Sequence, residues 1–178
     1  QKQKGEHYNQ WMLRPFRGIL PQVDASVYVD DSAQVIGDVR IGADSSVWMN
    51  VVIRGDVNII RIGSRTNIQD GTIVHVMRDT HPTIVGDEVT VGHAALLHGC
   101  TIEDRCLIGM GAQLLNGVRI GADSIVAAGT LVTEETTIPP RSLVMGRPGK
   151  VKRALTDEEV ASILDYAERY VNYKKDYE

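Results

Sequence analysis

An aliphatic residue recurs at every sixth position through most of this chain, and this repeat limits the possible folds more than any other feature. The series runs from Val23 to Val144, with a three-residue shift after Ile59 and a four-residue insertion before Ile84. Of the 21 positions reached by these steps, 20 are aliphatic and Thr90 is the exception. A period of six fits neither an α-helix nor plain alternating strands with long loops. It indicates a short strand followed by a sharp corner.

Most hexads also carry a small or β-branched residue four positions after the aliphatic one. These residues are Ala33, Val39, Ser45, Val51, Thr66, Thr72, Ala94, Cys100, Cys106, Ala112, Val118, Ser124 and Thr130. If both residues point inward, three flat faces close into a triangular prism with 18 residues per coil, and coils stack about 4.8 Å apart through parallel ladder bonds. We therefore predict an all-β solenoid, a left-handed parallel β-helix of hexapeptide repeats with about seven coils. A β-sandwich with chance periodicity is the alternative.

A helix is predicted after the repeat stops at Gly146–Gly149. Thr156 and Glu159 form a capping box, and apolar residues follow at helical spacing over 160–171. We divide the chain into an N-terminal extension at 1–12, the β-helix at 13–150, and a C-terminal α-helix at 151–178 that packs on the β-helix. Residues 1–10 are polar, lack the apolar stretch of a signal peptide, and are left out of the fold reasoning.

Charge and cysteine content exclude several classes of partner. With 19 basic and 23 acidic residues the formal net charge is −4, which argues against nucleic acid or an acidic membrane as a partner. No apolar run approaches the roughly 20 residues that span a bilayer. Two cysteines, Cys100 and Cys106, are too few for a disulfide framework, and both fall at the small inward position as core residues. We expect a cytoplasmic protein.

Three histidines are candidates for metal binding. His75 follows the inward Val74, and His98 lies two residues after Leu96. Three hexads separate Val74 from Leu96, so the two histidines should share a face one coil apart, close enough to share a metal ion. His93 belongs to the neighbouring face and could join this site only from another chain of a three-fold trimer.

This placement predicts a three-histidine metal site between subunits. Three histidines and an open fourth position are typical of catalytic Zn²⁺, which lowers the pKa of bound water towards about 7. The alternative is that all three are ordinary polar residues on the prism. His81 lies in the insertion, and we expect it to be solvated in a surface loop.

Four short motifs on the repeats resemble the γ-class carbonic anhydrases, and most closely their bacterial branch. They are Arg54-Gly55-Asp56, Asn67-Ile68-Gln69-Asp70-Gly71 followed by His75, Val91-Gly92-His93, and His98-Gly99-Cys100. The resemblance extends from about Leu13 to the final helix. It implies a homotrimer that holds zinc, or iron or cobalt, on His75 and His98 of one subunit and His93 of the next. The implied reaction is reversible hydration of CO2 to bicarbonate by metal-bound hydroxide.

The same resemblance implies roles for four further residues. Gln69 corresponds to the amide that hydrogen-bonds the metal-bound water. Arg54 and Asp70 correspond to a pair that bridges subunits near the site, either as an interface salt bridge or in catalysis. Asp56 corresponds to a carboxylate that orients the site or stabilises the interface.

This sequence departs from the archaeal members of the class at three points. Their proton-shuttle glutamate, three residues after the first histidine, is replaced by Arg78, and a second site glutamate is replaced by Val57. An asparagine of the C-terminal helix lines their pocket. Near that point this chain has Arg169, Tyr170 and Asn172. We expect slower proton transfer, or a route through buffer or His81.

Two other functions fit the repeat. Many hexapeptide-repeat proteins transfer acyl groups from acyl-CoA with one histidine as general base, and a thioesterase is a related option. A trimeric, non-catalytic scaffold that binds metal or a partner is the third hypothesis, favoured by the missing carboxylates.

Overall fold

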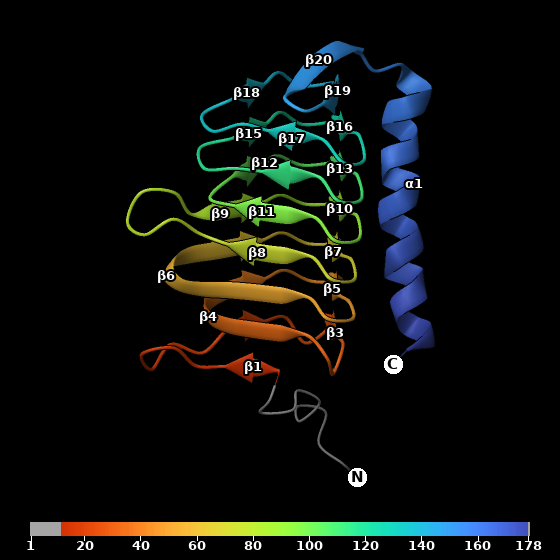
Figure 1. The fold of residues 1–178 in the computed structure, drawn as a ribbon. Helices are drawn as coiled ribbons and strands as arrows, with labels where there is room; N and C mark the ends of the chain where they lie inside the picture. Colours follow the sequence, from red (N-terminus) through yellow and green to blue (C-terminus); the bar gives the residue numbers. More distant parts are fainter. Residues whose placement is uncertain (1–11, 178) are drawn as a thin grey trace.

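Hexapeptide repeats wind this chain into a parallel β-solenoid of about seven coils, so the predicted fold class is confirmed (Figure 1). The computed structural model describes residues 12–177. Within the solenoid, each inner strand pairs in parallel with the strands one coil earlier and one coil later, and this ladder satisfies the backbone of the short strands. Corners are sharp because residues such as Asp44, Arg65 and Asp123 adopt positive φ.

The strands form three faces, which we call A, B and C. Face A contains β1 (Leu13–Arg14), the first half of β4 (Gln34–Ile41), the first half of β6 (Val52–Ile62), β8 (Ile73–His75), β11 (Leu96–His98), β14 (Gln113–Leu114) and β17 (Leu131–Val132). Face B contains β2 (Gln22–Val23), the second halves of β4 and β6, β9 (Thr83–Val85), β12 (Thr101–Ile102), β15 (Arg119–Ile120) and β18 (Thr137–Ile138). Face C contains β3 (Tyr28–Val29), β5 (Ser46–Val47), β7 (Asn67–Ile68), β10 (Thr90–Val91), β13 (Leu107–Ile108), β16 (Ile125–Val126), β19 (Ser142–Gly146) and β20 (Gly149–Ala154).

The core is a column of aliphatic side chains along the solenoid axis, and its phase differs from the predicted one in one coil. Val85, Val91 and Leu97 point inward, where the six-residue count selected Ile84, Thr90 and Leu96. The small inward residue of that coil is likewise Ala95, because Ala94 is an exposed corner residue with a φ of 55°. The reason is that the insertion after Val74 shifts the phase by one residue more than counted. A five-residue step from Leu97 to Ile102 restores it.

A second difference lies in β6. Ile60 is fully buried, whereas Ile59 is only partly buried, so the predicted inward position is off by one. The pairing of β6 with β4 jumps from Gly37–Gly55 to Val39–Ile60. Asp38 therefore stands opposite the four residues from Asp56 to Ile59, and these bulge out of the ladder.

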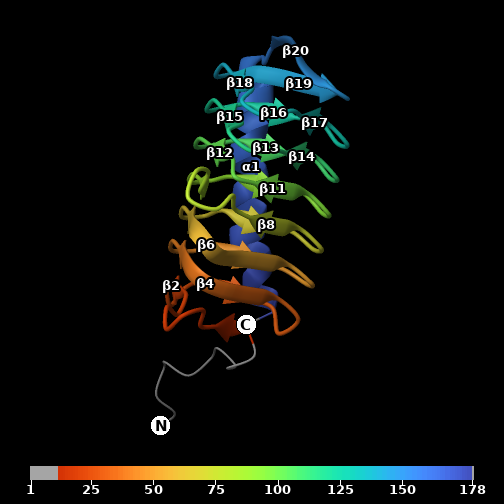
Figure 2. The ribbon, with the colours of Figure 1, turned by 60° about the vertical axis from the view of Figure 1, so that its left-hand side comes forward.

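The α-helix of the described residues, α1 (Asp157–Tyr173), is continued by the short 3₁₀ helix η1 (Lys174–Asp176) and lies along face C (Figures 1 and 2). The predicted capping box is present, with Thr156 Oγ1 accepting from Glu159 N at 3.2 Å and Glu159 Oε2 accepting from Thr156 N at 2.9 Å. Ile163, Ala167 and Val171 are its buried residues. Because α1 covers face C, the outward-facing Thr90 is also buried.

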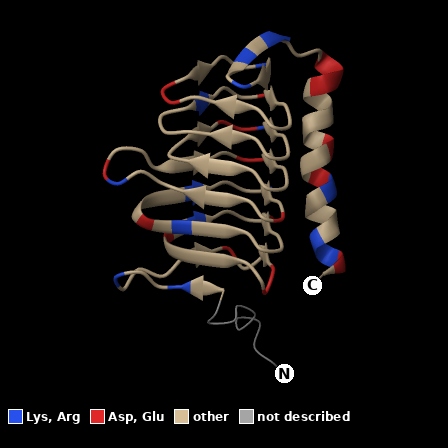
Figure 3. Cartoon of the chain, in the orientation of Figure 1, with Lys and Arg blue, Asp and Glu red and all other residues tan. Residues whose placement is uncertain are grey.

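Before α1, the chain forms an antiparallel hairpin of β19 and β20 that the sequence analysis did not anticipate. Its basic strand β20 lies near the acidic first turn of α1, and Arg153 forms an ion pair with Glu159 at 2.8 Å (Figure 3). At the other end of the helix, Lys174 Nζ donates to Ser26 O at 2.6 Å. Among the described residues, no helix combines the length and apolarity needed to cross a membrane.

Candidate active site

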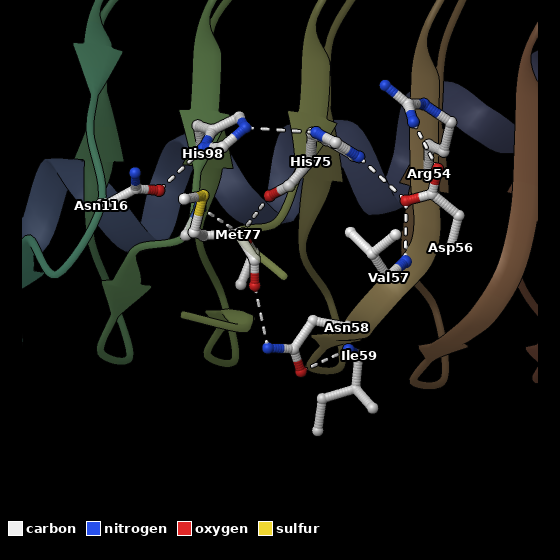
Figure 4. Close-up of polar contacts among 11 residues, drawn as sticks. Arg54, Asp56, Val57, Asn58, Ile59, His75, Met77, His98 and Asn116 are labelled. Atoms are coloured by element: carbon white, nitrogen blue, oxygen red, sulfur yellow. Dashed lines mark hydrogen bonds and ion pairs between the residues drawn. The ribbon is translucent and has the colours of Figure 1, made fainter. Parts of the chain in front are cut away.

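His75 and His98 lie side by side on face A, as the hexad count predicted. β8 and β11 pair in parallel with His98 opposite His75, and the two ring centroids are 5.1 Å apart. Their facing nitrogens, His75 Nδ1 and His98 Nε2, are separated by 3.1 Å (Figure 4). Two nitrogens that bind one tetrahedral zinc ion at about 2.0–2.1 Å lie about 3.3 Å apart. The pair therefore has the spacing of two ligands of a single metal ion.

The outer nitrogen of each imidazole faces an acceptor. His75 Nε2 lies 2.9 Å from Asp56 Oδ1, and His98 Nδ1 lies 2.8 Å from Asn116 Oδ1 (Figure 4). A carboxylate and an amide oxygen only accept, so both outer nitrogens carry the proton. In neutral rings the two inner nitrogens then face each other with lone pairs, an arrangement that needs a cation between them or a shared proton. The donor set thus fits a metal ion.

Asp56 is held in place by the bulge in β6. It accepts hydrogen bonds from Arg54, from His75 and, at 2.8 Å, from Val57 N, and its side chain is only 13% exposed. Burial alone would raise the pKa of this carboxyl, but the hydrogen bonds from His75 and Arg54 outweigh it and hold the pKa below its usual value. A charged Asp56 is the kind of outer partner that orients metal-binding histidines.

His93 lies on a different face, as predicted. It follows β10 at the end of face C, and its Nδ1 lies 3.0 Å from Asp70 Oδ2. The side chains of His93 and Asp70 are 47% and 44% exposed, so this imidazole is open to the surface of the chain. Within residues 12–177, no three His, Cys, Asp or Glu side chains gather as a metal site in one chain.

Gln69 and Asp70 follow β7 and accompany His93 on this side of the prism. Gln69 is almost completely buried, and its Nε2 donates to Asn67 Oδ1 at 3.0 Å. Asn67 Nδ2 in turn donates to Thr90 Oγ1 at 2.9 Å, beneath α1. The amide of Gln69 is therefore held in one orientation. Arg54, in contrast, pairs with Asp56 in this chain, and Asp70 pairs with His93.

Of the three helix residues considered for the pocket, the structure brings Tyr170 to the site. It lines a cavity of about 400 Å³ together with Asp70 and Trp48. Burial raises the pKa of Tyr170, and the negative charge of Asp70 raises it further. Arg169 instead packs over the ring of Tyr166, and Asn172 accepts a hydrogen bond from Lys175.

The positions that depart from the archaeal pattern also have clear locations. Val57 lies in the β6 bulge and lines a hollow of about 230 Å³ beside Asp56. Arg78 is exposed in the loop after β8. His81 was expected to be solvated, but its Nε2 lies 2.9 Å from Glu135 Oε1, and its side chain is 31% exposed. It is paired because the loop folds back, with Met77 bridging to His81.

Two residues that extend the hydrogen bonds of the histidine pair, Asn116 directly and Glu134 through Asn116, were missed from the sequence. Asn116 binds His98, and its Nδ2 lies 3.4 Å from Glu134 Oε1. A signal for both was present, because His98, Asn116 and Glu134 are spaced 18 residues apart, which is one coil. Stepping by whole coils from each candidate ligand would have found them.

Comparisons with known proteins agree with this fold. Residues 99–134 match the family model described as bacterial transferase hexapeptide (six repeats). The chain is 47% identical over 95% of its length to gamma carbonic anhydrase 1, mitochondrial, of Arabidopsis thaliana, and it spans 66% of that relative. It is 41% identical to a carbonic anhydrase of Geobacillus kaustophilus, over 90% of this chain and 87% of the relative. A solved structure of a hexapeptide transferase family protein from Anaplasma phagocytophilum matches 96% of this chain and 100% of its own, with a TM-score of 0.92 and 36% identity.

Proposed function

Because this chain belongs to the γ-carbonic anhydrase-like family of hexapeptide-repeat proteins, we propose that it catalyses the reversible hydration of CO2 to bicarbonate. The observation that carries the proposal is the pair of imidazoles of His75 and His98, whose facing nitrogens lie 3.1 Å apart. Outer acceptors on both rings direct nitrogen lone pairs towards the space between them. Such a pair fits a metal ion better than a single general base.

In this proposal the metal is zinc, with iron or cobalt as alternatives, and a homotrimer completes its ligands. His75 and His98 come from one subunit and His93 from the next, since His93 lies on another face with an exposed imidazole. A metal ion in this position supplies Lewis-acid activation of water near neutral pH. Asp70 orients His93 just as Asp56 orients His75.

The remaining site residues position substrate and carry charge. Gln69 presents its amide from a fixed orientation, because Asn67 holds its Nε2. Arg54 keeps Asp56 ionised and oriented. Hydration of CO2 yields bicarbonate and one proton, and this proton has to reach solvent. Arg78 and Val57 bring no carboxylate for that transfer, so we expect turnover to depend on buffer concentration.

The decisive experiment is a stopped-flow CO2 hydration assay on protein with confirmed metal. Protein is purified anaerobically without chelator, its metal content per chain is measured, and its mass in solution is compared with three times the 19.6 kDa chain. We expect at least about a third of an equivalent of zinc, iron or cobalt per chain, because three histidine donors bind such an ion tightly. We also expect CO2 hydration to be faster than in buffer alone.

Two variants sharpen the assay. His93→Ala should remove both the metal and the rate while the mass stays trimeric, and His81→Ala serves as the matched control for metal content because His81 pairs with Glu135. A metal-loaded protein with no rate above buffer, or a His93→Ala variant that behaves like wild type, refutes the proposal.

Acyl transfer from acyl-CoA is the second candidate, since the matching family model is named for transferases. This reaction requires one histidine as general base. Full acyl-transfer activity in the metal-free protein would favour it over CO2 hydration. The cytoplasmic location stays a prediction from the cysteine content.

A further inference from the structure

The hydrogen bonds around His98 continue outward along face A for two more coils. Asn116 lies one coil beyond His98, and Glu134 lies one coil beyond Asn116. The side chains of Asn116, His98, His75 and Asp56 lie in a row along the direction of coil stacking (Figure 4), and Glu134 contacts Asn116 at the outer end of this row. Such a row gives each imidazole one outer partner.

The backbone around Asn116 is pinned on both sides. Asn116 O accepts from Glu135 N at 2.9 Å, and Gly117 N donates to Gly99 O at 2.8 Å. With its main chain held, the side-chain amide has two orientations to choose between. Glu134 decides between them, because its carboxylate only accepts and therefore selects the Nδ2 side of the amide. Asn116 Oδ1 is then turned towards His98.

Gly99 makes room for this contact. A Cβ atom at Gly99 would lie 2.5 Å from Asn116 Oδ1 and 2.8 Å from His81 Cβ. Both distances are far below a normal contact, so any side chain at position 99 would push the amide oxygen away from His98. The missing side chain directly after His98 thus belongs to the same arrangement.

We propose that Asn116 is a positioning residue that fixes the tautomer of His98, and that Glu134 fixes the orientation of Asn116. With Oδ1 towards the ring, His98 carries its proton on Nδ1 and directs the Nε2 lone pair towards His75. A flipped amide would offer N–H groups instead and would favour a proton on Nε2, the nitrogen that faces the metal position. The consequence for metal affinity rests on the proposed function, whereas the tautomer itself does not.

The tautomer is tested first in metal-free His75→Phe protein, in which the Nε2 lone pair of His98 no longer faces the lone pair of His75 Nδ1. Long-range ¹H–¹⁵N spectra of the imidazole rings, recorded at about pH 8 where an unperturbed imidazole is neutral, identify which nitrogen of His98 is protonated. We expect the Nδ1–H form while Asn116 is present and a mixture with the Nε2–H form once Asn116→Leu is added. An Nε2–H form of His98 in the protein that keeps Asn116 overturns the proposal.

Zinc affinity is the second readout, measured by competition with a chelator. Loss of an outer partner typically weakens metal binding about 10- to 100-fold, and we expect this for Asn116→Leu. Asn116→Asp keeps the acceptor for His98 but loses the donor to Glu134, so it should weaken zinc binding less than Asn116→Leu does. Glu135→Gln is the matched control, since it changes the adjacent carboxylate that pairs with His81.

The outcomes separate this inference from the proposed function. Equal losses in Asn116→Leu and Glu135→Gln, or an unchanged His98 tautomer in Asn116→Leu, refute the positioning role. Wild-type protein that binds no zinc refutes the metal site of the proposed function, while the tautomer spectra still decide the role of Asn116.

Discussion

Replacing Gly109 with alanine should destabilise the protein far more than replacing Gly111, two residues further along the same coil. An ideal Cβ on Gly109 would lie 2.4 Å from Ala128 N and 2.7 Å from Ala127 C, both backbone atoms of the next coil. Normal contacts begin near 3.5 Å, so the two coils would have to separate locally by about 1 Å. At Gly111 a Cβ would meet no atom within 4 Å, and only its φ of 67° disfavours a side chain.

The magnitudes follow from the bonds that such a separation would break. Gly109 N donates to Val126 O at 2.7 Å, and Leu107 N donates to Ser124 O at 2.9 Å. Losing two or three ladder bonds at about 1 kcal/mol each, with about 1 kcal/mol of remaining strain, gives about 3–4 kcal/mol for Gly109→Ala. Gly111→Ala should lose only the left-handed penalty of about 1–2 kcal/mol.

Urea unfolding followed by circular dichroism measures both free energies of unfolding. All samples are compared at one protein concentration, because assembly would make apparent stability concentration-dependent. Equal losses for the two variants, or a larger loss for Gly111→Ala, would refute the reasoning that coil stacking, and not backbone conformation, requires glycine at position 109.

Three further predictions concern the core, the cysteines and the helix cap. Leu97→Ala, at a fully buried position directly before His98 in β11, should lower the free energy of unfolding by about 2–5 kcal/mol in the same urea assay; a loss under about 1 kcal/mol would mean that the core is loosely packed. Burial raises the pKa of Cys106 to about 12, and both thiols are buried, so a thiol reagent should modify neither cysteine in native protein and both in denaturant, and native modification would contradict the burial. The hydrogen bonds from Arg153 and from Thr156 N lower the pKa of Glu159 to about 2, so its stabilisation is present above about pH 4.3, the ordinary glutamate value, and disappears as pH falls towards 2. The melting temperatures of wild type and Glu159→Gln should therefore converge as pH falls through that window. A difference in melting temperature that does not change with pH would show that the ionised Glu159 does not contribute.

The six-residue repeat made the solenoid predictable, and the errors in the predicted inward positions are local. A step of six places inward residues correctly from Ile102 to Val144, because neither insertions nor deletions interrupt that stretch. Around the loop after Val74, counting failed by one residue. Only the parallel pairing of Leu97 with Val74 and Leu114 shows which side chains enter the core there.

By itself, the sequence determined which coil and which face of the solenoid most residues occupy, and where the capped helix begins. It could do so because six-residue periodicity and capping are local properties of the chain. It thereby placed His75 and His98 on one face and His93 on another. Only the tertiary structure decided which atoms meet: the β6 bulge that turns Asp56 to His75, and the Asn116 amide that turns His98. These contacts join residues 18 to 23 positions apart, and their geometry depends on how each coil registers on the next.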